Sequence, residues 1–493
     1  MILLRRAIIF FFVLCSFNAY ANFDFNANCI KAYRNILSLK LNTARSLIAT
    51  EKKKNPQNSI PYLLDNYVDY FILLTSESEV DFERLKNNKT FRLSRMEKDD
   101  KNSPYYLFAQ AEINLQWALT RARFQEYFTS AIEINRAYNL LQENTKKFPS
   151  FLPNQKDLGM INVILGSVPE GLRRAMSTFG IRGNTKNGVR MLENLVDRLP
   201  GSSYAHFYDE AVFYLAYVQT DILNDPSAYA KIIANTQDID SESLLKSYIR
   251  GYAGLKMGHN QDAINALSKK PSGSEYQSYP YLDYLLGIAK AHLLDNSATG
   301  YLLNYLKNYR GINFVKDTYL NLAWLELLKG NRNGYRTYTE WLKVKGYAYH
   351  EKDKQALIEA NDPVPNISLL KARLLFDGGY YDRALAQIDD KKMDDFKISR
   401  DKIEYCYRLG RIYDEISQDE FAVKFYQFAI DLGKNERYYF ASNAALRIAF
   451  VYEKRKDTVK ASYFYNTALN MKSHDYENSI ENKAKEGLKR MGN

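Results

Sequence analysis

Small and apolar residues follow a helical pattern along much of the chain, and the stretch from Tyr407 to Ile430 shows it most clearly. Its inward positions are taken by Gly410, Ala422 and Ala429 rather than by leucine. Two antiparallel helices cross closely only where the side chains at the crossing are small. The strict alternation of apolar and polar residues that is typical of strands does not occur. The pattern therefore predicts an all-α chain of paired helices.

The spacing of these residues repeats along the C-terminal half. With Gly410 as position 8 of a unit, Tyr413 and Tyr426 stand at positions 11 and 24, which resembles the tetratricopeptide repeat, a helix–turn–helix unit of about 34 residues. The resemblance implies a tetratricopeptide-like helical-hairpin solenoid, coiled as a right-handed superhelix. Small residues recur at position 8 and are 36, 36, 49, 38 and 39 residues apart: Gly251, Gly287, Ala323, Ala372, Gly410 and Ala449.

A second part of the pattern continues into the N-terminal half. A small residue is followed twelve positions later by proline three times: Ala44 with Pro56, Ala137 with Pro149, and Gly188 with Pro200. Because proline cannot continue a helix, each pair predicts the end of a second helix. Breaks between helices are expected at 77–101, 224–241 and 346–366, and the last should contain an extra short helix.

The first residues have the pattern of a secretory signal peptide. Arg5 and Arg6 precede an apolar run at 7–17, and Ala19 and Ala21 supply the small residues of a cleavage site after Ala21. Lipidation at Cys15 is a less favoured alternative, because Leu14 is larger than the residue usual before a lipidated cysteine. The predicted location is periplasmic or secreted. The predicted organisation is a signal peptide (1–21), divergent helical hairpins (22–245), weak repeat units (246–345), a connection (346–366) and C-terminal repeat units (367–493).

The segment 157–193 is too rich in glycine for an ordinary helical hairpin. Its order of residues resembles the inclusion-body-clearance tetratricopeptide family and uncharacterised exported proteins of the Bacteroidetes type: Ser167-Val168-Pro169, Leu172, Phe179-Gly180-Ile181-Arg182-Gly183, Gly188 and Leu192. It departs from the eukaryotic pattern in having one proline after the serine, and Gly183-Asn184 in place of an acidic-basic pair. Pro169 is expected to open a helix that ends near Phe179. The resemblance implies a non-enzymatic adaptor and identifies no partner.

Charge and composition favour no particular class of partner. The formal net charge is +11, from 68 basic and 57 acidic residues, but the basic residues are scattered and suit a solvated exterior. The short basic runs at 52–54 and 173–174 lack interleaved aromatic residues, so nucleic-acid binding is not predicted. The 40 tyrosines suit half-buried helix surfaces.

Motifs for chemistry are sparse, so no catalytic residue, metal or cofactor is predicted. The five histidines have no metal-ligand spacing, and neither Cys29 nor Cys406 has a neighbouring catalytic signature. Two alternatives to an adaptor stay open. One is an enzyme of the helical-toroid, glycan-active kind, with carboxylates converging in a cleft. The other is a glycan- or small-ligand-binding protein that stacks ligands on exposed aromatic rings, although Trp117, Trp324 and Trp341 fit core positions.

The remaining candidate is a binding surface on the first helices of the C-terminal units, the concave face of such a solenoid. Aromatic and arginine side chains anchor many interfaces, and those at exposed positions of this face are Arg373, Phe376, Tyr407, Arg411 and Phe450. The alternative is that these rings pack inside the stack. The resemblance does not include the Lys/Asn set that binds C-terminal carboxylates. The predicted function is an exported scaffold or adaptor that binds envelope proteins, and peripheral association with the outer membrane is left open.

Overall fold

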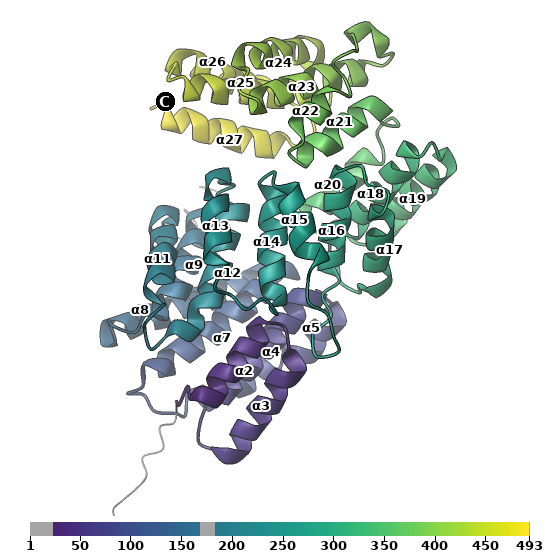
Figure 1. Cartoon of the computed structure of the whole chain (residues 1–493). Helices are drawn as coiled ribbons and strands as arrows, with labels where there is room; N and C mark the ends of the chain where they lie inside the picture. The colour runs from purple at the N-terminus through teal and green to yellow at the C-terminus, as the bar shows by residue number, and fades with distance from the viewer. Residues whose placement is uncertain (1–22, 168–182, 493) are drawn as a thin grey trace, which may run out of the picture. The chain divides into compact units, whose positions relative to one another are not determined.

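The computed structural model describes residues 23–167 and 183–492. All regular secondary structure in these residues is helical, with helices packed in neighbouring pairs, so the predicted all-α helical-hairpin class is confirmed (Figure 1). The predicted signal peptide, its cleavage point after Ala21 and Cys15 lie outside the described residues. So do the predicted helix between Pro169 and Phe179 and the basic pair at 173–174.

The chain forms two compact units. Unit 1 comprises residues up to Ala253 together with Ala266–Leu282 and Tyr309–Ile312. Within it, α2 pairs with α3, α7 with α8, and α9 with α11. Its helices are α2 (Ala27–Leu37), α3 (Leu41–Lys54), α4 (Ile60–Ser76), α5 (Glu79–Leu85), α6 (Asn88–Met96), α7 (Pro104–Arg123), α8 (Tyr127–Lys147), α9 (Asn154–Ser167), α11 (Thr185–Arg198), α12 (Tyr208–Tyr217), α13 (Tyr229–Asn235) and most of α14 (Leu244–Lys256).

Unit 2 comprises Gly254–Asn265, Asp283–Asn308 and Asn313–Asn493. Its most extensive helix pairs are α18 with α19, α23 with α24, and α25 with α26. Its helices are most of α15 (Asn260–Ser268) and α16 (Tyr281–His292), then α17 (Ala298–Asn308), α18 (Val315–Leu328), α19 (Arg332–Val344), α20 (Glu351–Glu359), α21 (Ile367–Asp377), α22 (Tyr381–Leu385), α23 (Ser399–Glu415), α24 (Asp419–Gly433), α25 (Phe440–Lys454), α26 (Thr458–Asn470) and α27 (Glu477–Arg490).

The small residues lie where paired helices touch, as the sequence predicts. A Cβ atom on Gly410 of α23 would lie 2.5 Å from the ring of Tyr426 on α24, so the crossing requires glycine. Ala422 and Ala429 of the same hairpin are fully buried. The Tyr426 hydroxyl then donates a hydrogen bond back to Asp414 at the end of α23, over 3.0 Å.

The next hairpin repeats this arrangement. Ala449 and Ala461 are fully buried, and the Tyr465 hydroxyl of α26 donates to Glu453 at the end of α25. In both hairpins, the tyrosine stands twelve residues after the carboxylate that it contacts. Small residues at the crossing and a tyrosine hydroxyl bond beside it therefore close each hairpin on itself.

The three proline signals in the N-terminal half also mark helix ends. Helices α3, α8 and α11 end at Lys54, Lys147 and Arg198, two residues before Pro56, Pro149 and Pro200. The small residue of each pair, Ala44, Ala137 or Gly188, is buried. The predicted hairpin ends are thus confirmed at all three places.

Two predicted breaks contain helices that were not expected, and the third is confirmed in detail. The polar stretch 77–101 contains α5 and α6 rather than a loop, and the break at 224–241 contains α13. Helix α6 is held by Arg92, which donates to Asp69 of α4 over 2.6 Å in a buried ion pair that local polarity could not reveal. The break at 346–366 does contain the expected short helix, α20. No helix in residues 23–167 or 183–492 is long and apolar enough to cross a membrane.

Candidate functional site

The first helices of the C-terminal hairpins lie next to one another within unit 2. Helix α21 packs against α23, α23 against α25, and α25 against α27. Basic side chains gather on these four helices in two sets. The paired arginines are Arg373, Arg400 and Arg408. The open basic cluster is Arg411, Arg447 and Lys483, one from each of α23, α25 and α27.

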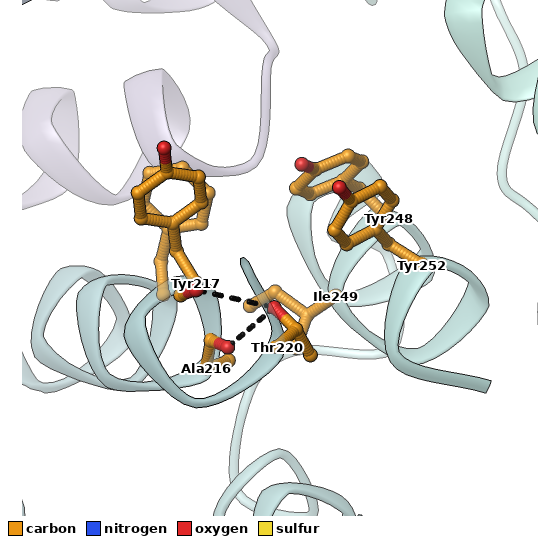
Figure 2. A pocket seen from close by; sticks show the side chains of 7 residues that line it. Ala216, Tyr217, Thr220, Tyr248, Ile249 and Tyr252 are labelled. Atoms are coloured by element: carbon orange, nitrogen blue, oxygen red, sulfur yellow. Dashed lines mark hydrogen bonds between the residues drawn. The ribbon is translucent and has the colours of Figure 1, made fainter. Parts of the chain in front are cut away.

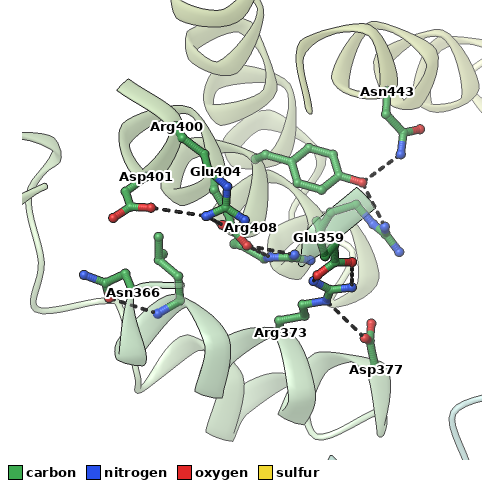
Figure 3. Close-up of polar contacts among 12 residues, drawn as sticks. Glu359, Asn366, Arg373, Asp377, Arg400, Asp401, Glu404, Arg408 and Asn443 are labelled. Atoms are coloured by element: carbon green, nitrogen blue, oxygen red, sulfur yellow. Dashed lines mark hydrogen bonds and ion pairs between the residues drawn. The ribbon is translucent and has the colours of Figure 1, made fainter. Parts of the chain in front are cut away.

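The paired arginines are neutralised by carboxylates. Arg373 donates two hydrogen bonds to Glu359, at 2.7 and 2.8 Å, and its guanidinium lies 4.7 Å from the centre of the Trp324 ring. Arg400 and Arg408 both pair with Glu404, each at 2.9 Å, and Arg400 also pairs with Asp401 at 3.3 Å (Figure 3). Burial would raise the pKa of Glu359, but Arg373 outweighs it and holds this pKa below its usual value. Such short, largely buried pairs fix the helices in place.

The open basic cluster surrounds the hydroxyl of Tyr407. This oxygen accepts a hydrogen bond from Arg411 over 3.1 Å and another from Asn443 over 2.8 Å. Burial opposes ionisation of Tyr407, but the charges of Arg411 and Arg447, with a smaller contribution from Arg408, lower its pKa from the ordinary value. Several positive charges therefore converge on one point of the face.

The members of this cluster have no carboxylate partner. Arg411, Arg447 and Lys483 form no ion pair with any residue that the structure describes. The Nε atoms of Arg411 and Arg447 are enclosed, and within the described part of the chain they have no hydrogen-bond partner. Partial burial and the charges of Arg447 and Arg411 lower the pKa of Lys483. Arg411 and Arg447 are half-buried and Lys483 is exposed.

The structure brings together four of the five residues predicted for this surface. The Arg411 guanidinium lies 4.6 Å from the centre of the Phe376 ring and binds the Tyr407 hydroxyl, while Arg373 is held nearby on α21 by Glu359. Phe450 is half-buried and instead meets the Tyr465 ring edge-on, at 5.9 Å between centroids.

Exposure of these residues differs from the expectation. Phe376 is 7% exposed and Tyr407 1%, so their rings pack inside the stack, as the alternative interpretation has it. The helices lie so close that a large side chain at these positions reaches the next helix before it reaches solvent. The exposed chemistry of this face is therefore carried by charges and not by aromatic rings.

Sequence reasoning missed Arg447 and Lys483. One signal was available for Arg447: it stands two residues before the small residue Ala449, as Arg408 stands two residues before Gly410. A basic residue repeated at the same place of consecutive units marks a charged row on the first helices. Lys483 has no comparable signal, because α27 follows the last hairpin that the spacing identified.

Unit 1 contains a second charged cluster that the sequence did not predict, the Lys156 network. The Lys156 ammonium lies 2.7 Å from Glu112, 2.9 Å from Asp157 and 3.0 Å from Glu210, and these four side chains are at most 1% exposed. The hydroxyls of Tyr33 and Tyr67 donate to Glu210. Five helices, α2, α4, α7, α9 and α12, contribute these groups.

One ammonium cannot neutralise three carboxylates. Burial, followed by the charge of Asp157, raises the pKa of Glu112 to about 8. Burial raises the pKa of Asp157 and Glu210 as well, so the three carboxylates bind protons as one coupled group. Because all of these side chains are sealed from solvent, a substrate cannot reach them, and the network joins helices of unit 1.

One cavity among the described residues of unit 1 is lined mainly by aromatic side chains and is too small for a ligand larger than water. A cavity lined by Phe213, Ala216, Tyr217, Thr220, Tyr248, Ile249 and Tyr252 has a volume of about 10 Å³, the size of one water molecule (Figure 2). Its Thr220 hydroxyl already donates to the backbone of Ala216 over 2.7 Å. Of the tryptophans, Trp117 and Trp324 are buried as expected, whereas Trp341 is 41% exposed, so that prediction is wrong for Trp341.

The described residues contain no activated cysteine and no group of side chains that could hold a metal ion. Cys29 and Cys406 are unpaired and buried, and burial raises the pKa of each thiol to about 12. Residues 23–167 and 183–492 contain no group of three His, Cys, Asp or Glu side chains that could hold a metal ion. No protein-family model matches the chain, and no curated protein matches it.

Proposed function

We propose that the chain is an exported, non-catalytic adaptor of the tetratricopeptide type, which binds other proteins of the cell envelope through the first helices of unit 2. The observation that carries this proposal is the open basic cluster: three cations from three consecutive first helices, none of them neutralised by a described carboxylate. Uncompensated, partly exposed charge on a rigid helical face is suited to recognition. The signal-peptide pattern supports the location.

The rigid setting of the cluster supports a binding role. Arg411 is fixed by Tyr407 and lies over Phe376, and the neighbouring arginines are locked by Glu359 and Glu404. Because these side chains are ordered before a partner arrives, little side-chain entropy is lost on binding. A preformed charged face of this kind gives specificity and fast association.

Crosslinking in cells followed by affinity purification from envelope fractions tests the proposal. We expect specific protein partners with the full chain, and fewer when Arg411 and Arg447 are replaced by glutamine. Recovery of no protein above the level of a mock purification would rule out the adaptor function.

A second candidate is glycan or small-ligand binding, and exposed rings in unit 2 favour it. Trp341 of α19 is 41% exposed, and the Tyr347 and Tyr349 rings, both partly exposed, stack with centroids 4.9 Å apart. Exposed rings can stack on the apolar face of a sugar. A glycan array probed with the full chain and with Trp341→Ala would support this candidate if binding is present and is lost in the variant.

A further inference from the structure

We propose that the open basic cluster binds side-chain carboxylates of an acidic segment in a partner protein. This inference rests on the proposed adaptor function and names the chemistry that the adaptor recognises. It concerns acidic side chains within a segment, not a chain terminus.

Three carboxylates act near the cluster, Asp414, Glu415 and Glu486, but none of them forms an ion pair with its cations. Glu415 acts on the charge of Arg411, and Glu486 acts on that of Lys483, but neither carboxylate forms an ion pair with them. Both glutamates are exposed, so solvent screens them. The paired arginines differ, because Arg400 and Arg408 share the buried Glu404. Three cations without an ion-pair partner thus lie beside three that are ion-paired.

One donor of the cluster, Arg411, is fixed in direction. Both acceptor positions of the Tyr407 hydroxyl are used, one by Arg411 and one by Asn443, so Tyr407 holds these side chains on adjacent helices. Tyr407 is 1% exposed and acts as a positioning residue. The Nε groups of Arg411 and Arg447 have no acceptor among the described residues, but they are enclosed, so a ligand meets the other N–H groups of the cluster. A site that offers N–H donors and positive charge, and little to accept a proton, selects an anion.

The surroundings favour a carboxylate-bearing protein segment over a polyanion. Asp377 on α21 is 43% exposed at its side chain and Glu415 on α23 is exposed, and both act on Tyr381 together with Arg411. Nucleic acid or polyphosphate, with a charge at every repeat, would meet these two carboxylates. A peptide with a few acidic residues avoids them and can pack its apolar side chains on half-buried rings such as Phe450 and Tyr439.

A direct binding assay tests this inference. The probe is a fluorescein-labelled ten-residue peptide in which glutamate alternates with serine, with an amidated C-terminus, and the matched probe has glutamine in place of glutamate. Fluorescence anisotropy with the full chain should show binding of the glutamate probe at least tenfold tighter than that of the glutamine probe. Equal binding of the two probes would overturn the inference.

Matched variants locate the site. The triple variant R411Q/R447Q/K483Q should weaken binding of the glutamate probe at least tenfold. The variant K53Q/K54Q/K146Q removes the same charge from exposed lysines of unit 1 and should change the affinity less than twofold. An equal loss in both variants would show that only net charge matters, and would overturn the inference. If the triple variant does not fold, R411K/R447Q/K483Q and the single variant R447Q carry the same test.

Two competition experiments show whether the site prefers an acidic peptide or a small anion. Unlabelled glutamate peptide should displace the probe at concentrations near its own dissociation constant, whereas citrate and inorganic phosphate should need at least a hundredfold more. Displacement by citrate or phosphate at the concentration of the peptide would show a site for small anions and would overturn the protein-segment inference.

The cellular experiment separates this inference from the proposed function. If the wild-type chain and the triple variant recover the same crosslinked partners, the carboxylate inference fails and the adaptor function stands. If the wild-type chain recovers none, the adaptor function fails, whatever the peptide assay shows.

Discussion

The Lys156 network of unit 1 and the open basic cluster of unit 2 use similar side chains with opposite charge balance. In the first, one ammonium lies among three carboxylates that are at most 1% exposed. In the second, three partly exposed cations have no described carboxylate partner. A sealed network must limit its charge internally, here because burial raises the pKa of all three carboxylates, that of Glu112 to about 8. Cations near solvent can stay without an ion-pair partner in the protein and can therefore pair with a charged ligand. Charge excess and access to solvent therefore separate a structural network from a binding surface.

Removal of the single cation of the sealed network should have the largest effect. Lys156→Met leaves Glu112, Asp157 and Glu210 buried together, and we expect a loss of about 3–5 kcal/mol in unfolding free energy. Urea unfolding followed by circular dichroism measures it. Lys147→Met is the control, because Lys147 and its partner Glu143 are about half exposed and should contribute no more than about 0.5 kcal/mol. Equal shifts for the two variants would show that the network contributes no stability.

Breaking a paired arginine should have an intermediate effect. Arg373→Met leaves Glu359 with Gln355 as its remaining partner, and we expect a loss of about 2–3 kcal/mol. The same unfolding measurement applies. The control is Lys354→Met, which removes the exposed ion pair between Lys354 and Glu351. It should leave the unfolding free energy nearly unchanged. If Arg373→Met leaves the unfolding free energy unchanged, Arg373 does not stabilise the fold and resembles the members of the open basic cluster.

The proton on Glu112 makes the stability of unit 1 depend on pH. Burial and Asp157 raise the pKa of Glu112 from 4.5 to about 8, so the folded state favours the protonated form. This stabilisation is complete below about pH 4.5 and is lost as the pH rises through about 8. As the pH is raised from 6 to 9, the thermal midpoint of the wild-type chain should fall, and that of Glu112→Gln should fall less. Identical pH profiles would show that Glu112 is ionised in the fold.

The open cluster should be the least important for stability. Arg411→Gln removes a cation that has no ion pair, and relief of repulsion from Arg447 and Lys483 offsets the lost contact with Tyr407. We expect a change of less than about 1 kcal/mol. The comparison variant on the same helix is Arg408→Gln, which should lose more because it leaves the buried Glu404 with Arg400 alone. If Arg411→Gln is as harmful as Arg373→Met, Arg411 is structural and the cluster is not open.

The hairpins could be predicted from the sequence because their signals are local. Gly410 and Tyr426 meet across one turn, and Pro200 follows directly on the helix that it limits. Steric contact over such short separations leaves a repeated mark in the sequence. The missed helices α5 and α6 lack this mark, since their stability comes from contacts such as Arg92 with Asp69, 23 residues away.

The two charged clusters could not be predicted because pairing depends on residues from distant helices. Tyr33 and Glu210, which are hydrogen-bonded in the Lys156 network, are 177 residues apart in the sequence. Tyr407 and Asn443 are 36 residues apart. Arg373 is paired by Glu359 of another helix, and Arg400 and Arg408 by Glu404 of their own helix, whereas no described carboxylate pairs with Arg411. The sequence therefore indicated the right helices and the wrong chemistry for Phe376 and Tyr407.

The tyrosine bonds that close α23 on α24 and α25 on α26 have a consequence for how the protein is made. Each bond spans twelve residues, so a hairpin can complete its own contacts soon after its second helix forms. Short loops close fast and at small entropic cost. A newly made chain can thus fold its C-terminal region one hairpin at a time, with no need to wait for distant segments.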